Sequence, residues 1–139
     1  MPSRTILVDN DGAIVAPNSF SILASAARTT TATSADFTNT AYRGLRITLN
    51  VGTIASTAPS LVLDIQAKVQ QAGTYTSMLQ SAAVIGTASN AYTIYPGIGA
   101  GSGANTNASH GFPNIFRAIV NANTTTAAIT YSVEGDWLL

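Results

Sequence analysis

Two carboxylates, Asp64 and Glu134, are the first side chains to consider for chemistry. A glycosidase needs two carboxyl groups that face each other across a cleft, and the sequence alone leaves this open for the pair. Each carboxylate, however, also stands at a polar position of an alternating apolar and polar segment, which is typical of a strand with one solvated face. We therefore expect both side chains to lie on solvated strand faces.

The single histidine of the chain restricts the possible metal sites and hydrolytic triads. His110 has no cysteine or second histidine to join it, so a metal site would need distant carboxylates. A hydrolytic triad would combine His110 with a serine and Asp36, Asp64 or Asp136, but "GSG" lacks the Gly-x-Ser-x-Gly elbow that exposes a nucleophilic serine. We predict no catalytic, cofactor-binding or metal-binding residues, and hence no enzyme.

Two loop-like segments resemble ligand-binding motifs only superficially. The Gly-rich residues 97–111 lack the spacing and the lysine of a phosphate-binding loop, and we interpret them as a long loop. Residues 9–12, Asp-Asn-Asp-Gly, lack the further ligands of a calcium loop. They are typical of a turn in a small hairpin.

The elements that position these groups follow from a two-residue alternation. Leu45, Ile47, Leu49 and Val51 alternate with polar residues, which indicates a half-buried strand. Residues 61–69 repeat the pattern, and residues 73–82 follow a turn at Gly73, so we expect a consecutive antiparallel set. A further strand is expected at residues 90–97, and residues 116–123 and 127–139 are expected to form a last hairpin. Residues 19–27 could form another strand, although their Ala content also allows a helical turn.

The fold class follows from these strands. Outside the Ala-rich N-terminal tract no segment shows a helical stripe, and β-branched residues are frequent throughout. Seven to nine short strands predict an all-β, antiparallel two-sheet β-sandwich, either jelly-roll or immunoglobulin-like. We expect an N-terminal arm with a hairpin over residues 1–18 and one sandwich domain over residues 19–139, with a long loop at residues 28–40. Arg117 is expected on a solvated face, and Trp137 at one end of the core.

The composition bears on partners and location. Of the 139 residues only 9% are charged, and the formal net charge is zero, so no basic field attracts nucleic acid. The apolar run at residues 6–8 is too short for a signal peptide or a membrane span, and no disulfide can form. We expect no nucleic acid and no membrane as partners, and association with itself or with a large assembly.

Several segments, in their order along the chain, resemble small structural proteins of tailed phages and prophages. They are an Ala-Ala-Arg-Thr tract (residues 26–29), a Thr-Ser-Ala-Asp step (33–36), Arg-Gly before a strand (43–44), a Leu-x-Leu-x-Ile-Gln-x-Lys strand (61–68), a Gly-x-Tyr turn (73–75) and Pro-x-x-x-Arg (113–117). This resemblance covers the chain from about residue 24 onward. It implies association with a virion.

Taken with the composition, the resemblance suggests a capsid decoration or cement protein, which acts through buried contact between subunits and needs no ionisable cluster. The expected partners are the major capsid protein and further copies of the chain, as a dimer or trimer, on the exterior of a virion assembled in the host cytoplasm. The N-terminal arm is expected to contact a neighbouring subunit through five apolar side chains: Ile6, Leu7, Val8, Ile14 and Val15.

The alternative is a tail or fibre component that recognises a glycan or protein on the host surface. Its contact residues would be the Gly-rich loop together with three tyrosines: Tyr75, Tyr92 and Tyr95.

Overall fold

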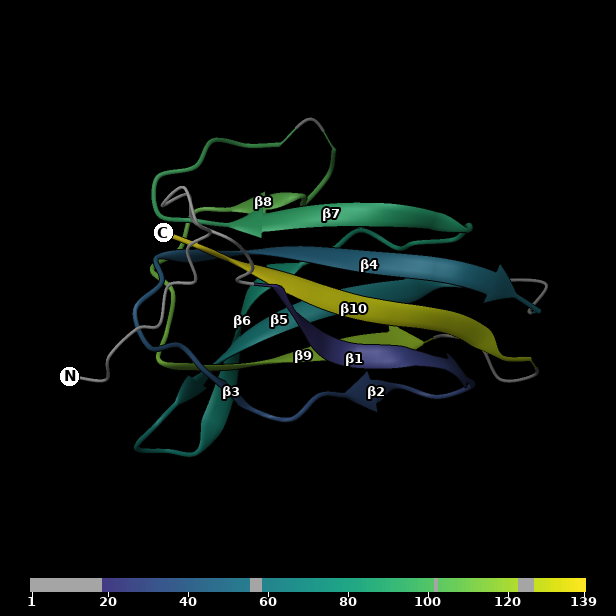
Figure 1. The fold of residues 1–139 in the computed structure, drawn as a ribbon, viewed down its shortest axis with the longest axis horizontal. Coiled ribbons are helices and arrows are strands. Elements are labelled where there is room, and N and C mark those ends of the chain that lie inside the picture. Colours follow the sequence, from purple (N-terminus) through teal and green to yellow (C-terminus); the bar gives the residue numbers. More distant parts are fainter. Residues whose placement is uncertain (1–18, 56–58, 102, 123–126) are drawn as a thin grey trace, which may run out of the picture.

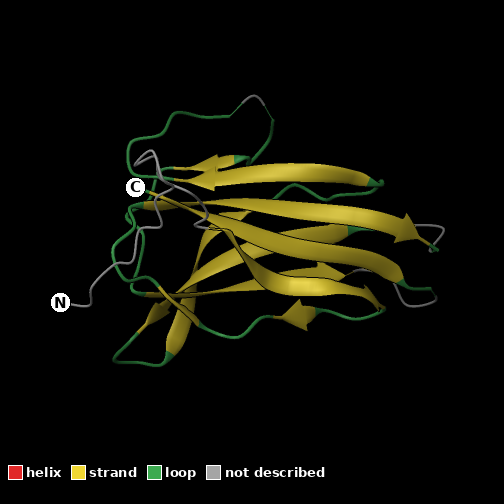
Figure 2. Ribbon diagram, in the orientation of Figure 1, coloured by secondary structure: helices red, strands yellow, loops and turns green. Residues whose placement is uncertain are grey.

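The computed structural model describes residues 19–55, 59–101, 103–122 and 127–139. These residues form ten strands and no helix, and the strands make two sheets that pack face to face (Figures 1 and 2). The expected all-β sandwich is confirmed. The predicted N-terminal arm, residues 1–18, lies outside the described residues, and so do its five expected contact residues.

Seven strands are long and three contain two residues each. The long strands are β1 (Ser19–Arg28), β4 (Gly44–Ile54), β5 (Leu61–Val69), β6 (Thr74–Gln80), β7 (Ala88–Ile94), β9 (Ile115–Ala122) and β10 (Ile129–Leu138). The short strands are β2 (Ala32–Thr33), β3 (Phe37–Thr38) and β8 (Asn107–Ala108).

One sheet has the order β1-β10-β4-β7-β8, which Figure 1 shows from the lower to the upper edge. The other has the order β2-β9-β5-β6, with β3 also paired to β9. All pairs are antiparallel except β7 with β8, which is parallel. We call the first of these two sheets the β10 sheet and the second the β5 sheet.

The core lies between the sheets and is made by the alternation seen in the sequence. Leu45, Ile47 and Leu49 of β4 are fully buried, as are Leu63 and Ile65 of β5. The residues between them point to the outer face of each sheet. Among the described residues, nineteen buried apolar side chains from Ile22 to Val133 form this cluster.

Two expected strand pairings are wrong. β4 and β5 follow one another in the chain but lie in different sheets, and so do β9 and β10; β5 pairs with β9 and β6, whereas β10 pairs with β4 and β1. Only β5 and β6 form the expected hairpin, around Gly73 with its positive φ of 68°. An alternating pattern fixes which face of a strand is apolar, but either sheet can supply the partner when both apolar faces meet in one core.

The two expected long loops each contain short strands. Residues 28–40 include β2 and β3, which pair with β9, and residues 97–111 include β8. The hydrogen bond from Ser34 N–H to the Ala118 carbonyl (2.8 Å) continues this pairing between β2 and β3. A strand of two residues is too short to show an alternating apolar and polar pattern, so composition alone does not reveal it.

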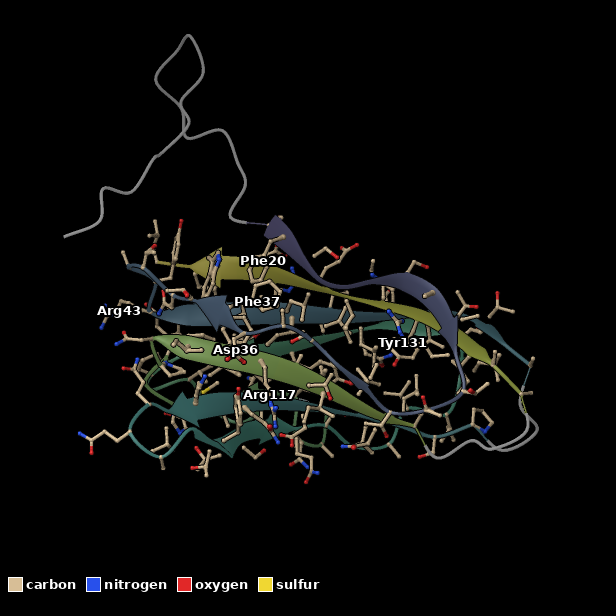
Figure 3. The ribbon with its side chains drawn as sticks, turned by 90° about the horizontal axis from the view of Figure 1, so that it is seen from below. Phe20, Asp36, Phe37, Arg43, Arg117 and Tyr131 are labelled. Atoms are coloured by element: carbon tan, nitrogen blue, oxygen red, sulfur yellow. The ribbon has the colours of Figure 1, made fainter. Side chains whose placement is uncertain are left out.

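An aromatic cluster closes one end of the sandwich. Trp137 stacks on Phe20 with ring centres 5.1 Å apart and on Tyr42 at 5.2 Å. Phe37 and Phe116 of the β5 sheet pack against the same group, with Phe20 to Phe37 at 5.3 Å (Figure 3). The predicted place of Trp137 at an end of the core is confirmed.

Gly44 is required by the close approach of two strands. A Cβ atom at this position would lie 2.4 Å from the carbonyl oxygen of Ile94 and 2.6 Å from Cδ2 of Tyr95. The carbonyl belongs to the neighbouring strand β7, so it cannot turn away as a flexible side chain would. Gly52, in the same strand, can accept a Cβ atom, because it would lie 3.8 Å from the Thr130 oxygen, an ordinary van der Waals contact.

We predict that Gly44→Ala lowers the free energy of unfolding by about 1–3 kcal/mol, the usual cost of overpacking. Gly52→Ala is the matched control in the same strand and should change it by less than about 0.5 kcal/mol. Urea denaturation of both variants measures the difference. Equal effects would show that the contact with Ile94 does not limit the fold.

Candidate contact surface

Charged and polar side chains concentrate on the outer face of the β5 sheet. Of the chain's six acidic and six basic residues, four lie here, joined by two uncharged polar side chains and one tyrosine. They come from β5, β6, β9 and the segment before β3, and we call them the polar ladder: Asp36, Asp64, Gln66, Lys68, Tyr75, Ser77 and Arg117.

The register of the sheet brings these residues together. Asp64, Gln66 and Lys68 are two apart on β5, so their side chains share its outer face. Gln66 lies opposite Arg117 of β9 and Ser77 of β6, and Lys68 lies opposite Tyr75. Cross-strand neighbours on one face interact directly.

Arg117 is central to the first half of the ladder. Its guanidinium carbon lies 3.4 Å from the centre of the Tyr75 ring, a cation–π contact. Its Nε donates to Oε1 of Gln66 (2.9 Å), and Nε2 of Gln66 donates to Oδ2 of Asp64 (2.8 Å). Ser77 donates its hydroxyl proton to the other oxygen of Asp64 at 2.5 Å, so the largely buried Asp64 carboxylate has a partner on each oxygen.

Tyr75 links this half to Asp36. Its hydroxyl donates to the Asp36 carboxylate, with distances of 2.9 and 3.0 Å to the two oxygens, and Lys68 Nζ forms an ion pair with Asp36 at 3.1 Å. Figure 3 shows Asp36 and Arg117 beside each other on this side of the molecule. The ladder therefore holds the segment before β3 against three strands of the sheet.

The electrostatics favour a fixed, ionised surface over proton transfer. The hydrogen bond from Tyr75, and then that from Lys68, lower the pKa of Asp36 below its ordinary value of 3.8. The same carboxylate raises the pKa of Lys68. Two acids and two bases balance one another, so the ladder is suited to positioning the backbone and to polar contact with a protein partner.

The two carboxylates considered for a glycosidase do not meet. Asp64 lies on the outer face of the β5 sheet, whereas Glu134 lies on the outer face of the β10 sheet, with the core between them. Glu134 is exposed as expected, but the expected solvated position of Asp64 is wrong, because neighbouring side chains of the ladder cover it and leave it 7% exposed. His110 is exposed, and its Nδ1 lies 2.9 Å from the carbonyl oxygen of its neighbour Gly111. No group of three metal-ligating side chains occurs in the described ranges. Nor does any helix there have the length and apolarity to cross a membrane.

The three tyrosines proposed for host recognition lie apart. Tyr92 is buried in the core, and burial raises its pKa. Tyr75 belongs to the polar ladder, and Tyr95 donates its hydroxyl proton to the carbonyl of Leu139 at 2.9 Å. They do not form a common recognition surface, so the expected role of Tyr92 as a contact residue is wrong.

Sequence reasoning placed Arg117 on a solvated outer face, which is confirmed, but did not find the ladder. The period of two on β5 predicts an outer row of side chains, whereas their partners on β6, β9 and the segment before β3 depend on register.

A scan against protein-family models finds no match for the chain, and a search of curated proteins finds none either.

The Asp36 contacts predict a pH-dependent contribution to stability. Because the folded-state pKa of Asp36 is lowered, its contribution is present above the ordinary pKa of 3.8 and is lost as the pH falls through the folded-state value. Asp36→Asn should therefore lower the melting temperature at pH 7 and have a smaller effect at pH 2.

Glu134→Gln provides the matched control, since Glu134 is an exposed acid on the other sheet. Thermal unfolding at both pH values should show no comparable pH-dependent loss for it. An Asp36→Asn variant with the same melting temperature as the parent at pH 7 would contradict the prediction.

Proposed function

We propose that the protein is a structural component of a phage virion, a decoration or cement protein that binds the major capsid protein and stabilises the shell. The observation that carries the proposal is the ordered set of segments that resembles structural proteins of tailed phages. The all-β sandwich is compatible with it, because such a domain presents two broad sheet faces to neighbours.

The residues that carry the resemblance have a shared structural use. Asp36, Lys68, Tyr75 and Arg117 come from four of its motifs and meet in the polar ladder. Gly44, from the Arg-Gly motif, permits the close packing of β4 on β7. These motifs contain no catalytic or ligand-binding pattern, and their residues instead hold strands of the sandwich in place. This use of the motifs supports a structural function.

The outer face of the β10 sheet supplies the kind of surface that such a function needs. It carries short side chains such as Thr48, Asn50, Ala91 and Ser132. Short side chains lose little conformational entropy when a partner covers them. Repetition over many sites of a shell then turns modest single contacts into stable attachment.

The N-terminal arm is proposed as a further contact with a neighbouring subunit. We predict that deletion of residues 1–15 reduces binding to capsids while the remaining chain still folds. The reason is that the core cluster of the described residues runs from Ile22 to Val133, and the deletion removes none of its members. Co-sedimentation with capsids measures the binding, and full binding by the shortened chain would refute the role of the arm.

Immunogold electron microscopy on intact source particles tests the location. Gold spread over the head supports decoration, and the heat stability of capsids with and without the protein then measures cementing. Gold confined to the tail would overturn the proposal in favour of host recognition. Unlabelled particles, with an antibody that binds the free protein, would refute an exposed virion role.

A further inference from the structure

Strand β7 presents an open sheet edge. It pairs with β4 along its whole length, from Ala88 opposite Val51 to Ile94 opposite Leu45. On its other side β8 pairs only with Thr93 and Ile94. Residues 88–92 therefore have a strand neighbour on one side only, among the described residues (Figure 1).

The backbone groups that face outward on this edge can be assigned. Thr93 N–H donates to the Thr106 carbonyl (2.9 Å) and Tyr95 N–H to the Ala108 carbonyl (3.1 Å), both away from β4. Since inward and outward residues alternate in an antiparallel strand, the N–H and C=O groups of Ser89 and Ala91 also point outward. No described residue forms a hydrogen bond with them.

The other sheet edges are protected, and this one is not. β1 and β6 carry register shifts in their pairing, and β2, β3 and β8 have two residues each. β7 has seven residues, no shift, no proline and no charged side chain. Shortness, bulges, proline and charge are the usual means by which proteins prevent an edge from accepting another strand.

A groove of about 440 Å³ runs beside this edge, lined by residues 82–92 with Ala104 and Thr106. Its lining includes Ile85, whose side chain is 71% exposed, the largest exposure of any large apolar side chain in the described part of the chain. The amide nitrogen Nδ2 of Asn90 is buried there without a hydrogen-bond partner among the described residues. A buried donor without a partner is costly.

We propose that the open edge of β7 accepts residues 4–8 of a second copy of this chain as an additional strand. This segment, Arg-Thr-Ile-Leu-Val, matches the five open residues in length and is rich in strand-forming residues. Its backbone would pair with Ser89 and Ala91. Ile6 and Val8, two apart, would share the face toward the groove.

The positions of donor and acceptor lead to a head-to-tail assembly. The described chain begins at Ser19 in β1, at one edge of the β10 sheet, and the acceptor β7 lies toward the opposite edge. The ten residues between the arm strand and Ser19 can span up to about 33 Å, enough to reach an adjacent copy. Such a heterologous contact closes into a ring when the rotation allows, which accords with the predicted dimer or trimer.

Two full-length variants separate donor from acceptor. Ile6→Asp/Val8→Asp places charges in the arm and leaves the edge intact. Ala91→Pro removes an outward N–H and leaves the inward bonds to β4 in place, since proline is tolerated where an edge N–H faces solvent. Ala91→Ser retains the N–H and is the matched control.

Sedimentation equilibrium of the purified proteins measures the association. The parent and Ala91→Ser should form oligomers, and each defective variant should raise the self-dissociation constant by at least about tenfold. Mixing the two defective variants should restore a 1:1 complex, because one supplies the arm and the other the edge. Capsids are absent from this assay, so its result is independent of the proposed virion function.

Contrary outcomes are distinct. Oligomers that persist in Ile6→Asp/Val8→Asp but not in Ala91→Pro would indicate direct β7-to-β7 pairing and refute the arm as occupant. A monomeric parent would refute a second copy. If Ala91→Pro fails to melt cooperatively, Ile85→Lys replaces it, since this exposed side chain can change without disturbing the core; full association by that folded variant would refute the groove.

Discussion

Burial of aliphatic rows between the two sheets is the interaction on which the rest of the structure depends. Each fully buried Leu, Ile or Val contributes about 1.5–3 kcal/mol relative to exposure, whereas an exposed ion pair contributes about 0–1 kcal/mol. The core cluster therefore determines that the two sheets pack face to face. The outer faces then select the register and the contacts: one carries the polar ladder, and the other carries short side chains together with Arg46, Glu134 and Asp136.

The polar ladder shows how a chain with few charges uses them. Lys68 contacts both Asp36 and the Tyr75 ring, and Arg117 contacts both Gln66 and the same ring. Tyr75 in turn contacts both an anion and a cation. Neighbouring charges that neutralise one another fix a surface without creating a long-range field. The few charged side chains of the ladder thus act locally, by fixing the positions of neighbouring strands. Most of the remaining surface can lie against neighbours without burying unpaired charge.

The sequence predicts strands more reliably than it predicts their neighbours. The alternation from Leu45 to Val51 places one face of β4 in the core, and the structure agrees. The same alternation does not reveal that β5 crosses to the other sheet, because either sheet offers an apolar face. Arg117 was expected on a solvated face, but its stacking on Tyr75, 42 positions away in the chain, depends on two pairings that only the folded sheet shows.

The open edge follows from the same physics as the closed core. A two-sheet sandwich has edges that a barrel would remove, and this chain protects them with short strands and register shifts except along β7. An unpaired edge without charge is a liability for a free monomer and a ready contact for an assembling subunit. The near-neutral composition favours association in the same way. Open edge and sparse charge would therefore both suit the proposed association of the chain with copies of itself.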